Sequence, residues 1–179
     1  IERLSPDTII LQGRYSGGAG DDILRMKKYS NALRIFELDD YIVSTPKKNS
    51  HARNKPANTE QMLRDGIALC DRVVVTTQAL ADVLSSMHSE IRVVPNMLPP
   101  EPWATLTSQR RTSKKPRVGW GGGTSHTGDL EIIADVVREL ANEVEWVFFG
   151  MCPEALRPYI HEFHGVIDLQ SYPYKLASL

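Results

Sequence analysis

The 179-residue sequence has only two cysteines, Cys70 and Cys152, and no apolar run that approaches the ~20 residues of a membrane span. Two cysteines cannot build a disulfide framework, so we expect a reducing compartment and a cytoplasmic protein. An excess of basic residues is also missing, since 21 Lys plus Arg stand against 22 Asp plus Glu, for a formal net charge of −1. This balance argues against a dedicated nucleic-acid binder. The first residue is Ile1 and no signal peptide is recognisable, so we expect a piece of a longer protein.

Short aliphatic runs alternate with helical patterns along the sequence, whose 41% hydrophobic and 24% charged residues are typical of a globular protein. Four runs predict buried strands, at residues 8–11, 34–38, 72–75 and 91–94. Helices are predicted from Asn58 to Leu69 and, capped by Thr76 and Thr77, after the third strand. The apolar face of that second helix is formed by Leu80, Val83, Leu84 and Met87. Continuous Val and Ile runs between helices are typical of parallel strands covered on both faces. The fold class is therefore α/β.

A proline-rich stretch interrupts this alternation at residues 99–116 and predicts a linker. It contains Pro99, Pro100, Pro102 and Pro116, and the basic residues Arg110, Arg111, Lys114 and Lys115. Downstream, strands are predicted at 117–120, 144–149 and 166–169, and helices from about 128 to 141, from Pro153 and from Pro173. We therefore predict two Rossmann-like βα blocks, residues 1–98 and 117–179, joined by this linker. The second block holds about three strands, fewer than a Rossmann-like half normally has, so we expect it to be truncated.

The strongest candidate for a ligand site is the glycine-rich segment at residues 119–129. It follows a predicted strand and opens a predicted helix, where free N–H groups and the positive helix end favour a phosphate. The candidate phosphate-binding residues are Gly121, Gly122, Gly123, Thr124 and His126. The segment matches neither G-x-G-x-x-G nor the P-loop, because Asp129 stands where the P-loop lysine would be. The alternative is a tight strand-to-helix turn in which His126 caps local backbone.

Three other groups of polar residues have a functional and a structural interpretation. Asp39 and Asp40 end a predicted strand and are suited to a divalent ion or to sugar hydroxyls, or to a turn and cap. The basic residues Lys47, Lys48, His51, Arg53 and Lys55 suit an anionic partner, including a membrane surface, or a solvated loop. His161 and His164 lie three apart on a predicted helix near Cys152, but a metal would need further ligands. We assign no catalytic residue and no metal site.

Several segments, in the same order along the chain, resemble those of the GT-B glycosyltransferases, which have two Rossmann-like domains around a cleft. Residues 36–41 resemble an acidic strand end, residues 70–77 a late element of the N-terminal domain, and residues 91–96 the valine-isoleucine-proline-asparagine stretch that closes it. Residues 118–122 and 147–150 are similar to the first two strands of the donor-binding domain, and 171–173 to the region that leads toward the nucleotide base. The similarity begins at about Arg34.

The resemblance implies transfer of a sugar from a nucleotide-sugar donor to a glycan or lipid-linked acceptor, in bacterial surface polysaccharide or lipopolysaccharide biosynthesis. It implies that the glycine segment contacts the donor diphosphate, that Arg14, Asp39 and Asp40 lie on the acceptor side, and that no cofactor or metal is essential. Peripheral contact with the inner membrane surface is compatible with it.

Two features depart from the family pattern. Thr124, Ser125 and His126 stand where many retaining members have an arginine and a lysine. The paired glutamates that hold the donor ribose and sugar lie further downstream in the family than Leu179. We therefore expect this piece alone to be inactive. The alternative function is a non-catalytic Rossmann-like binding or interaction module of a larger protein.

Overall fold

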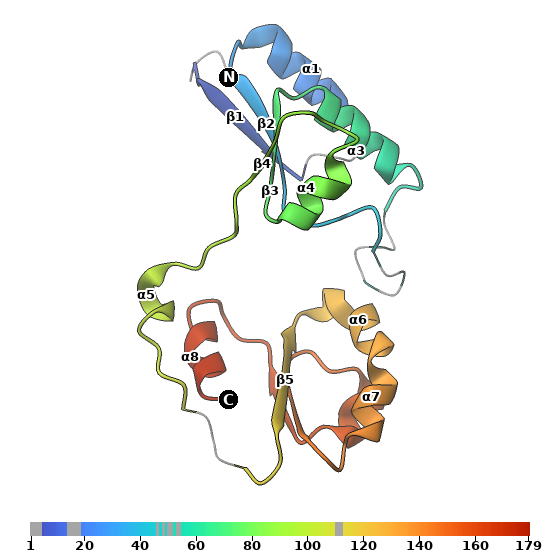
Figure 1. Cartoon of the computed structure of the whole chain (residues 1–179), viewed down its shortest axis with the longest axis vertical. Helices are drawn as coiled ribbons and strands as arrows, with labels where there is room; N and C mark the ends of the chain where they lie inside the picture. The colour runs from blue at the N-terminus through green and yellow to red at the C-terminus, as the bar shows by residue number, and fades with distance from the viewer. Residues whose placement is uncertain are drawn as a thin grey trace. The chain divides into compact units, whose positions relative to one another are not determined.

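The computed structural model of the chain describes residues 5–13, 19–45, 47, 49, 52, 55–109 and 113–179. The chain divides into two compact units: unit 1 comprises residues 1–45 and 55–97, and unit 2 comprises residues 46–54 and 98–179. Each unit has one parallel β-sheet with helices packed on it (Figure 1). The predicted α/β class with parallel sheets is thus confirmed. Within the described residues, no helix is long and apolar enough to cross a membrane.

Unit 1 has a four-stranded parallel sheet whose strands follow one another in chain order. The strands are β1 (Thr8–Gln12), β2 (Leu33–Leu38), β3 (Arg72–Val75) and β4 (Ile91–Val93), and the helices between them are α1 (Ala19–Tyr29), α3 (Thr59–Ala68) and α4 (Gln78–Leu84). Crossovers between parallel strands are right-handed, so a sheet built in sequential order places every connecting helix on the same face. Figure 1 shows the three helices together on that face.

The core of unit 1 lies between this face and the helices. Alternate strand residues point into it, with Phe36 and Leu38 from β2 and Val73 and Val75 from β3. The helices contribute Ile23, Leu63, Ile67, Leu80, Ala81 and Leu84. The predicted cap is confirmed, because the Thr77 hydroxyl accepts a hydrogen bond from Leu80 N.

The other face of this sheet and its β4 edge differ from the prediction that strands are buried on both faces. Ile10, on the face opposite the core, is 63% exposed. β4 lies at the end of the strand order, and Val93 and Val94 are 38% and 56% exposed. Val83, expected on the apolar face of α4, is also exposed. In unit 1 the hydrophobic runs predicted the four strands correctly, but the sequential strand order leaves one face of the sheet without crossover helices.

Unit 2 has a three-stranded parallel sheet in the order β5-β6-β7. The strands are β5 (Arg117–Gly122), β6 (Glu145–Gly150) and β7 (Glu162–Gly165); the helices are α5 (Pro100–Trp103), α6 (Thr127–Ile132), α7 (Ala134–Glu139) and α8 (Tyr172–Ala177), with 3₁₀ helices η1 (Thr124–His126) and η2 (Glu154–Tyr159). On one face, Leu130 of α6 and Val137 of α7 pack with Phe148 of β6. On the other face, the Tyr172 ring of α8 stacks on Phe149, with centroids 5.1 Å apart.

The third strand of unit 2 corrects a prediction. Residues 166–169 were expected to form it, but the strand is Glu162–Gly165, paired with β6, and Val166 and Leu169 are exposed. His161 and His164 are therefore not on a helix. Residues 166–169 are the more aliphatic run, whereas the strand that forms alternates polar and apolar side chains.

One helix boundary also differs from the prediction. The helix expected over 128–141 is interrupted at Ile133, whose ψ is 7°, so α6 and α7 are separate. The β-branched pair at Ile132 and Ile133 is a weak helix former at this point. In the stretch predicted as a linker, Gln109 N donates to Ala177 O at 2.8 Å and Trp103 contacts the Tyr172 ring, so part of it packs on α8.

A charge network joins the amino ends of the three strands of unit 2. The Arg117 guanidinium donates to Glu145 at 3.3 Å and to Glu162 at 2.8 Å, and His164 Nε2 lies 2.9 Å from Glu162. The hydrogen bond from Arg117 is the main cause that lowers the pKa of Glu162, and burial opposes it. The charged carboxylate is therefore favoured in the folded protein.

We predict that replacing Phe36 by Ala destabilises unit 1 by about 3–5 kcal/mol, because it removes a fully buried ring from the centre of the core. Ile10→Ala, on the exposed face, is the matched control and should cost no more than about 0.5 kcal/mol. Hydrogen exchange of the β3 amides measures both effects within unit 1. Equal protection in the two variants would contradict the assignment of the core face.

We also predict acid sensitivity for unit 2. Because the folded-state pKa of Glu162 lies below its ordinary value of 4.5, its contribution to stability is present above that value and is lost as the pH falls through the folded-state pKa. Glu162→Gln should be less stable than the wild type at pH 7 and should lose less stability on acidification. The exposed Glu154→Gln is the control. Urea unfolding followed by tryptophan fluorescence reports unit 2, since all three tryptophans lie there.

Candidate functional site

Two glycines meet at the carboxyl ends of β5 and β6. Gly122 pairs with Gly150, whose φ of +98° is in the region that only glycine adopts readily. A Cβ on Gly150 would overlap the carbonyl oxygen of Gly122, so the two strands approach where neither residue has a side chain. The glycine turn was expected to begin at Gly121, but Gly121 and Gly122 are the last two residues of β5.

The predicted phosphate-binding residues are divided between the two faces of the sheet, because alternate strand residues point in opposite directions. Gly121 faces Tyr172, whose hydroxyl would lie 3.3 Å from an added Cβ, and it lines a cavity of about 370 Å³ with Phe149. Gly122 faces the other way, where an added Cβ would lie 2.8 Å from the Trp120 ring and 3.6 Å from His126 Cδ2. Gly121 and His126 thus do not lie on the same face.

The turn itself is short. Gly123 is extended, and its carbonyl oxygen accepts a hydrogen bond from His126 N at 3.1 Å, which closes the 3₁₀ turn η1. The Thr127 hydroxyl donates to Thr124 O at 2.9 Å. Thr124 and His126 are exposed at this turn. Three of the predicted residues, Gly123, Thr124 and His126, are therefore brought together directly beyond the end of β5.

Asp129 and Asn49, neither of them predicted as site residues, form hydrogen bonds at this turn. His126 Nδ1 lies 2.7 Å from Asp129 Oδ2, and Asn49 Nδ2 donates to Asp129 Oδ1 at 3.3 Å. The hydrogen bond to His126, and then that from Asn49, lower the pKa of Asp129. The spacing of His126 and Asp129 by three residues at a helix start could have indicated this pair. Asn49 is far away in the sequence and gave no such indication.

The contact of Asn49 with the start of α6 corrects the prediction that the backbone N–H groups there are free. The Oδ1 atom of Asn49 accepts a hydrogen bond from Gly128 N at 2.7 Å. Because Asn49 is only 5% exposed, this contact is shielded from solvent. One of the backbone donors that was predicted to face a phosphate is therefore already satisfied by a side chain.

The predicted acceptor-side residues lie in unit 1. Asp39 and Asp40 follow β2 and are exposed, and the carbonyl oxygen of Asp39 accepts a hydrogen bond from the Thr76 hydroxyl at 3.1 Å. Arg14 lies outside the described residues. Of the basic stretch, Lys48, His51 and Arg53 also lie outside them.

Two of the other candidate metal ligands, Cys152 and His164, have protein partners. Cys152 Sγ lies 3.4 Å from Pro153 O, and His164 binds Glu162. Burial raises the pKa of the Cys70 thiol to about 11, which keeps it neutral. Among the described residues, no group of three or more His, Cys, Asp or Glu side chains is arranged to hold a metal ion.

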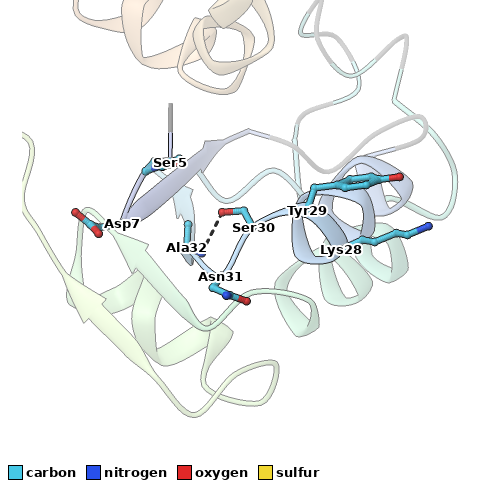
Figure 2. A pocket seen from close by; sticks show the side chains of 8 residues that line it. Ser5, Asp7, Lys28, Tyr29, Ser30, Asn31 and Ala32 are labelled. Atoms are coloured by element: carbon cyan, nitrogen blue, oxygen red, sulfur yellow. Dashed lines mark hydrogen bonds between the residues drawn. The ribbon is translucent and has the colours of Figure 1, made fainter. Parts of the chain in front are cut away.

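A larger polar cavity of about 550 Å³ lies in unit 1 (Figure 2). Asp7 and Ala32 line it directly before β1 and β2, together with Lys28 and Tyr29 from the end of α1. It is thus at the amino ends of the strands, and Ser30 Oγ closes the loop by accepting a hydrogen bond from Ala32 N at 3.1 Å. Ligands of parallel α/β sheets bind beyond the carboxyl ends, so this cavity is at the opposite end from the expected site.

No protein-family model matches the sequence, and no curated protein matches it either. Among solved structures, the chain is similar to the crystal structure of a mutant of TarM from S. aureus in complex with fondaparinux, α-GlcNAc-glycerol and UDP. The two share 14% sequence identity with a TM-score of 0.45, over 98% of this chain and 32% of that chain. The chain thus spans about a third of the length of that protein.

We predict that Gly150→Ala destabilises unit 2 strongly, by several kcal/mol, because the residue has a positive φ and an added Cβ would meet the Gly122 carbonyl. Gly165→Ala is the matched control, since it ends the neighbouring strand β7 and an added Cβ there meets no atom within 4 Å. Tryptophan-monitored urea unfolding compares the two variants. Similar midpoints would show that the glycine contact is not required.

Proposed function

We propose that the chain is part of a nucleotide-sugar-dependent glycosyltransferase of the GT-B type. In this proposal residues 1–98 form its acceptor side, apart from the segment 46–54 that belongs to unit 2, 99–116 are a linker, and 117–179 begin its donor side. The enzyme moves a sugar to a glycan or lipid-linked acceptor in surface polysaccharide biosynthesis. Support comes from the ordered sequence segments that resemble this family. The observation that carries the proposal is the side-chain-free contact of Gly122 with Gly150, directly before the turn η1.

This contact lies where a nucleotide diphosphate is best accommodated. In open parallel α/β sheets, ligands bind beyond the carboxyl ends of the strands, near the point where helices change from one face to the other. In unit 2, α6 and α7 pack with Phe148 on one face, whereas Tyr172 of α8 stacks on Phe149 on the other. Glycines at this end let a phosphate approach the backbone N–H groups closely.

The proposed roles of the residues follow from the charge that develops during transfer. The diphosphate leaves with increased negative charge, which donors already in place stabilise. Backbone N–H groups of the segment from Gly121 to Thr124 and the imidazole of His126 supply such donors. Arg14, Asp39 and Asp40 are proposed to contact hydroxyl groups of the acceptor. No metal or other cofactor is required in this proposal.

One observation favours the alternative, a non-catalytic binding or interaction module. The Gly128 N–H, which a phosphate would otherwise use, is hydrogen bonded to Asn49, and the Asp129 carboxylate lies beside it. A turn whose backbone N–H is already hydrogen bonded to a protein side chain needs no ligand, which is what we expect of a purely structural turn.

Ligand-observed NMR against uridine, guanosine and thymidine diphosphates tests the two functions. We expect selective binding of one nucleoside diphosphate, at least tenfold weaker in Gly123→Val, because the valine side chain would occupy the phosphate position. An added Cβ at Gly123 meets no atom closer than 4.0 Å, so this variant should remain folded. Gly122→Val should also abolish binding. In this variant the valine Cβ would lie 2.8 Å from the Trp120 ring, so the local fold must change as well.

Gly165→Ala serves as the binding control, and a dinucleotide, S-adenosylhomocysteine and a short oligonucleotide complete the panel. Unchanged affinity in Gly123→Val would remove the turn from the site. Failure of every nucleotide to bind would favour the non-catalytic module.

A further inference from the structure

The imidazole ring of His126 is held by Asp129, because Nδ1 lies 2.7 Å from a carboxylate oxygen of this residue. Gly122 lies near the ring, whose Cδ2 is 3.6 Å from the position that a Cβ of this glycine would occupy. The ring is nevertheless more than half exposed, so Nε2, next to Cδ2, is the nitrogen left for a ligand. The orientation of this side chain is therefore set by protein contacts while one nitrogen stays accessible.

Asp129 is itself fixed by a residue from outside the turn. The Asn49 carboxamide uses both ends: Oδ1 accepts from Gly128 N at 2.7 Å, and Nδ2 donates to Asp129 Oδ1 at 3.3 Å. The second carboxylate oxygen of Asp129 is thereby left for His126. Asn49 is almost fully buried, which restricts its side chain to this arrangement. A chain of hydrogen bonds thus runs from Asn49 through Asp129 to His126.

We propose that Asp129 and Asn49 are positioning residues that hold His126 with its proton on Nδ1 and its Nε2 directed to the diphosphate of the bound nucleotide. The inference rests on the proposed function for the identity of the ligand. A carboxylate is an acceptor only, so the Nδ1 of His126 must be the donor in this pair. In the neutral ring, Nε2 then accepts from a hydroxyl; in the protonated ring, Nε2–H donates to a phosphate oxygen.

This arrangement makes diphosphate binding depend on pH. A charge-assisted hydrogen bond from a protonated imidazole to phosphate is stronger than any bond the neutral Nε2 can make with it. In the described part of the chain, the charged group in contact with His126 is Asp129 of α6. Among the described residues, no other charged side chain forms a hydrogen bond or an ion pair with His126. Affinity for the diphosphate should therefore be higher at pH 6 than at pH 8.

Imidazole ¹⁵N NMR of the unliganded chain tests the positioning directly. At pH 8 we expect the Nδ1–H tautomer of His126 in the wild type, and in Asp129→Ala a shift to the Nε2–H form that a free histidine side chain prefers. Asn49→Asp keeps an acceptor for Gly128 N–H but places a second carboxylate against Asp129, so it should disturb the tautomer without removing the cap. Asp135→Ala, which breaks a pair of the same spacing with Arg138 on α7, is the control and should change nothing.

Titration with the nucleoside diphosphate that the panel selects tests the role in binding. Between pH 8 and pH 6, we expect wild-type affinity to rise by about three- to tenfold relative to His126→Gln, which corrects for titration of the ligand itself. In Asp129→Ala this rise should fall below about twofold, an effect that a merely structural cap would not produce.

The possible outcomes distinguish the proposed function from the proposed positioning of His126 by Asp129 and Asn49. If no nucleoside diphosphate binds the wild type at either pH, the proposed function fails, and the tautomer alone decides whether Asp129 positions His126. An Nδ1–H tautomer that persists in Asp129→Ala overturns the positioning role whatever binds. A shifted tautomer combined with a wild-type pH profile in that variant also overturns it, since His126 would then not act on the phosphate.

Discussion

The contact between the backbones of Gly122 and Gly150 is the constraint on which the rest of unit 2 depends. Any side chain at Gly150 would displace the Gly122 carbonyl, and with it the last ladder position between β5 and β6. A Cβ at Gly122 would lie 2.8 Å from the ring of Trp120, which packs on Phe148 in the core, and would therefore displace it. The same two glycines thus connect the strand ends at the site with the hydrophobic core beneath them.

Much of the fold could be predicted from short-range patterns. Aliphatic runs located β1, β2 and β3 to within about one residue, and the Thr77 cap followed from a threonine directly before an apolar helical stripe. The strand β7 could not be found in this way, because its stability comes partly from Glu162, which pairs with Arg117 two strands away and with His164 in β7 itself. The exposed face around Ile10 depends on the order of strands in the sheet, which no local pattern contains.

The location of the candidate turn along the chain could be predicted, but not all of the residues that form it. A glycine run between a strand and a helix indicated where the turn would be, and Gly123, Thr124 and His126 do lie together there. Strand alternation separates Gly121 from them, since β5 continues two residues further than expected. Asn49 could not have been predicted, because its role depends on a tertiary contact with a backbone N–H rather than on its sequence neighbours.

The long separation between Asn49 and its partners has a consequence for how the protein is made and how it can vary. Gly128 and Asp129 follow Asn49 by 79 and 80 positions. At 5–20 residues per second, a nascent chain exposes Asn49 for roughly 4 to 16 s before its partners are synthesised. Genetic exchange at residues 99–116 would combine Asn49 from one parent with a turn from the other. The hydrogen bonds of Asn49 would survive such an exchange only where the new turn also presents a backbone N–H and a carboxylate in the same positions.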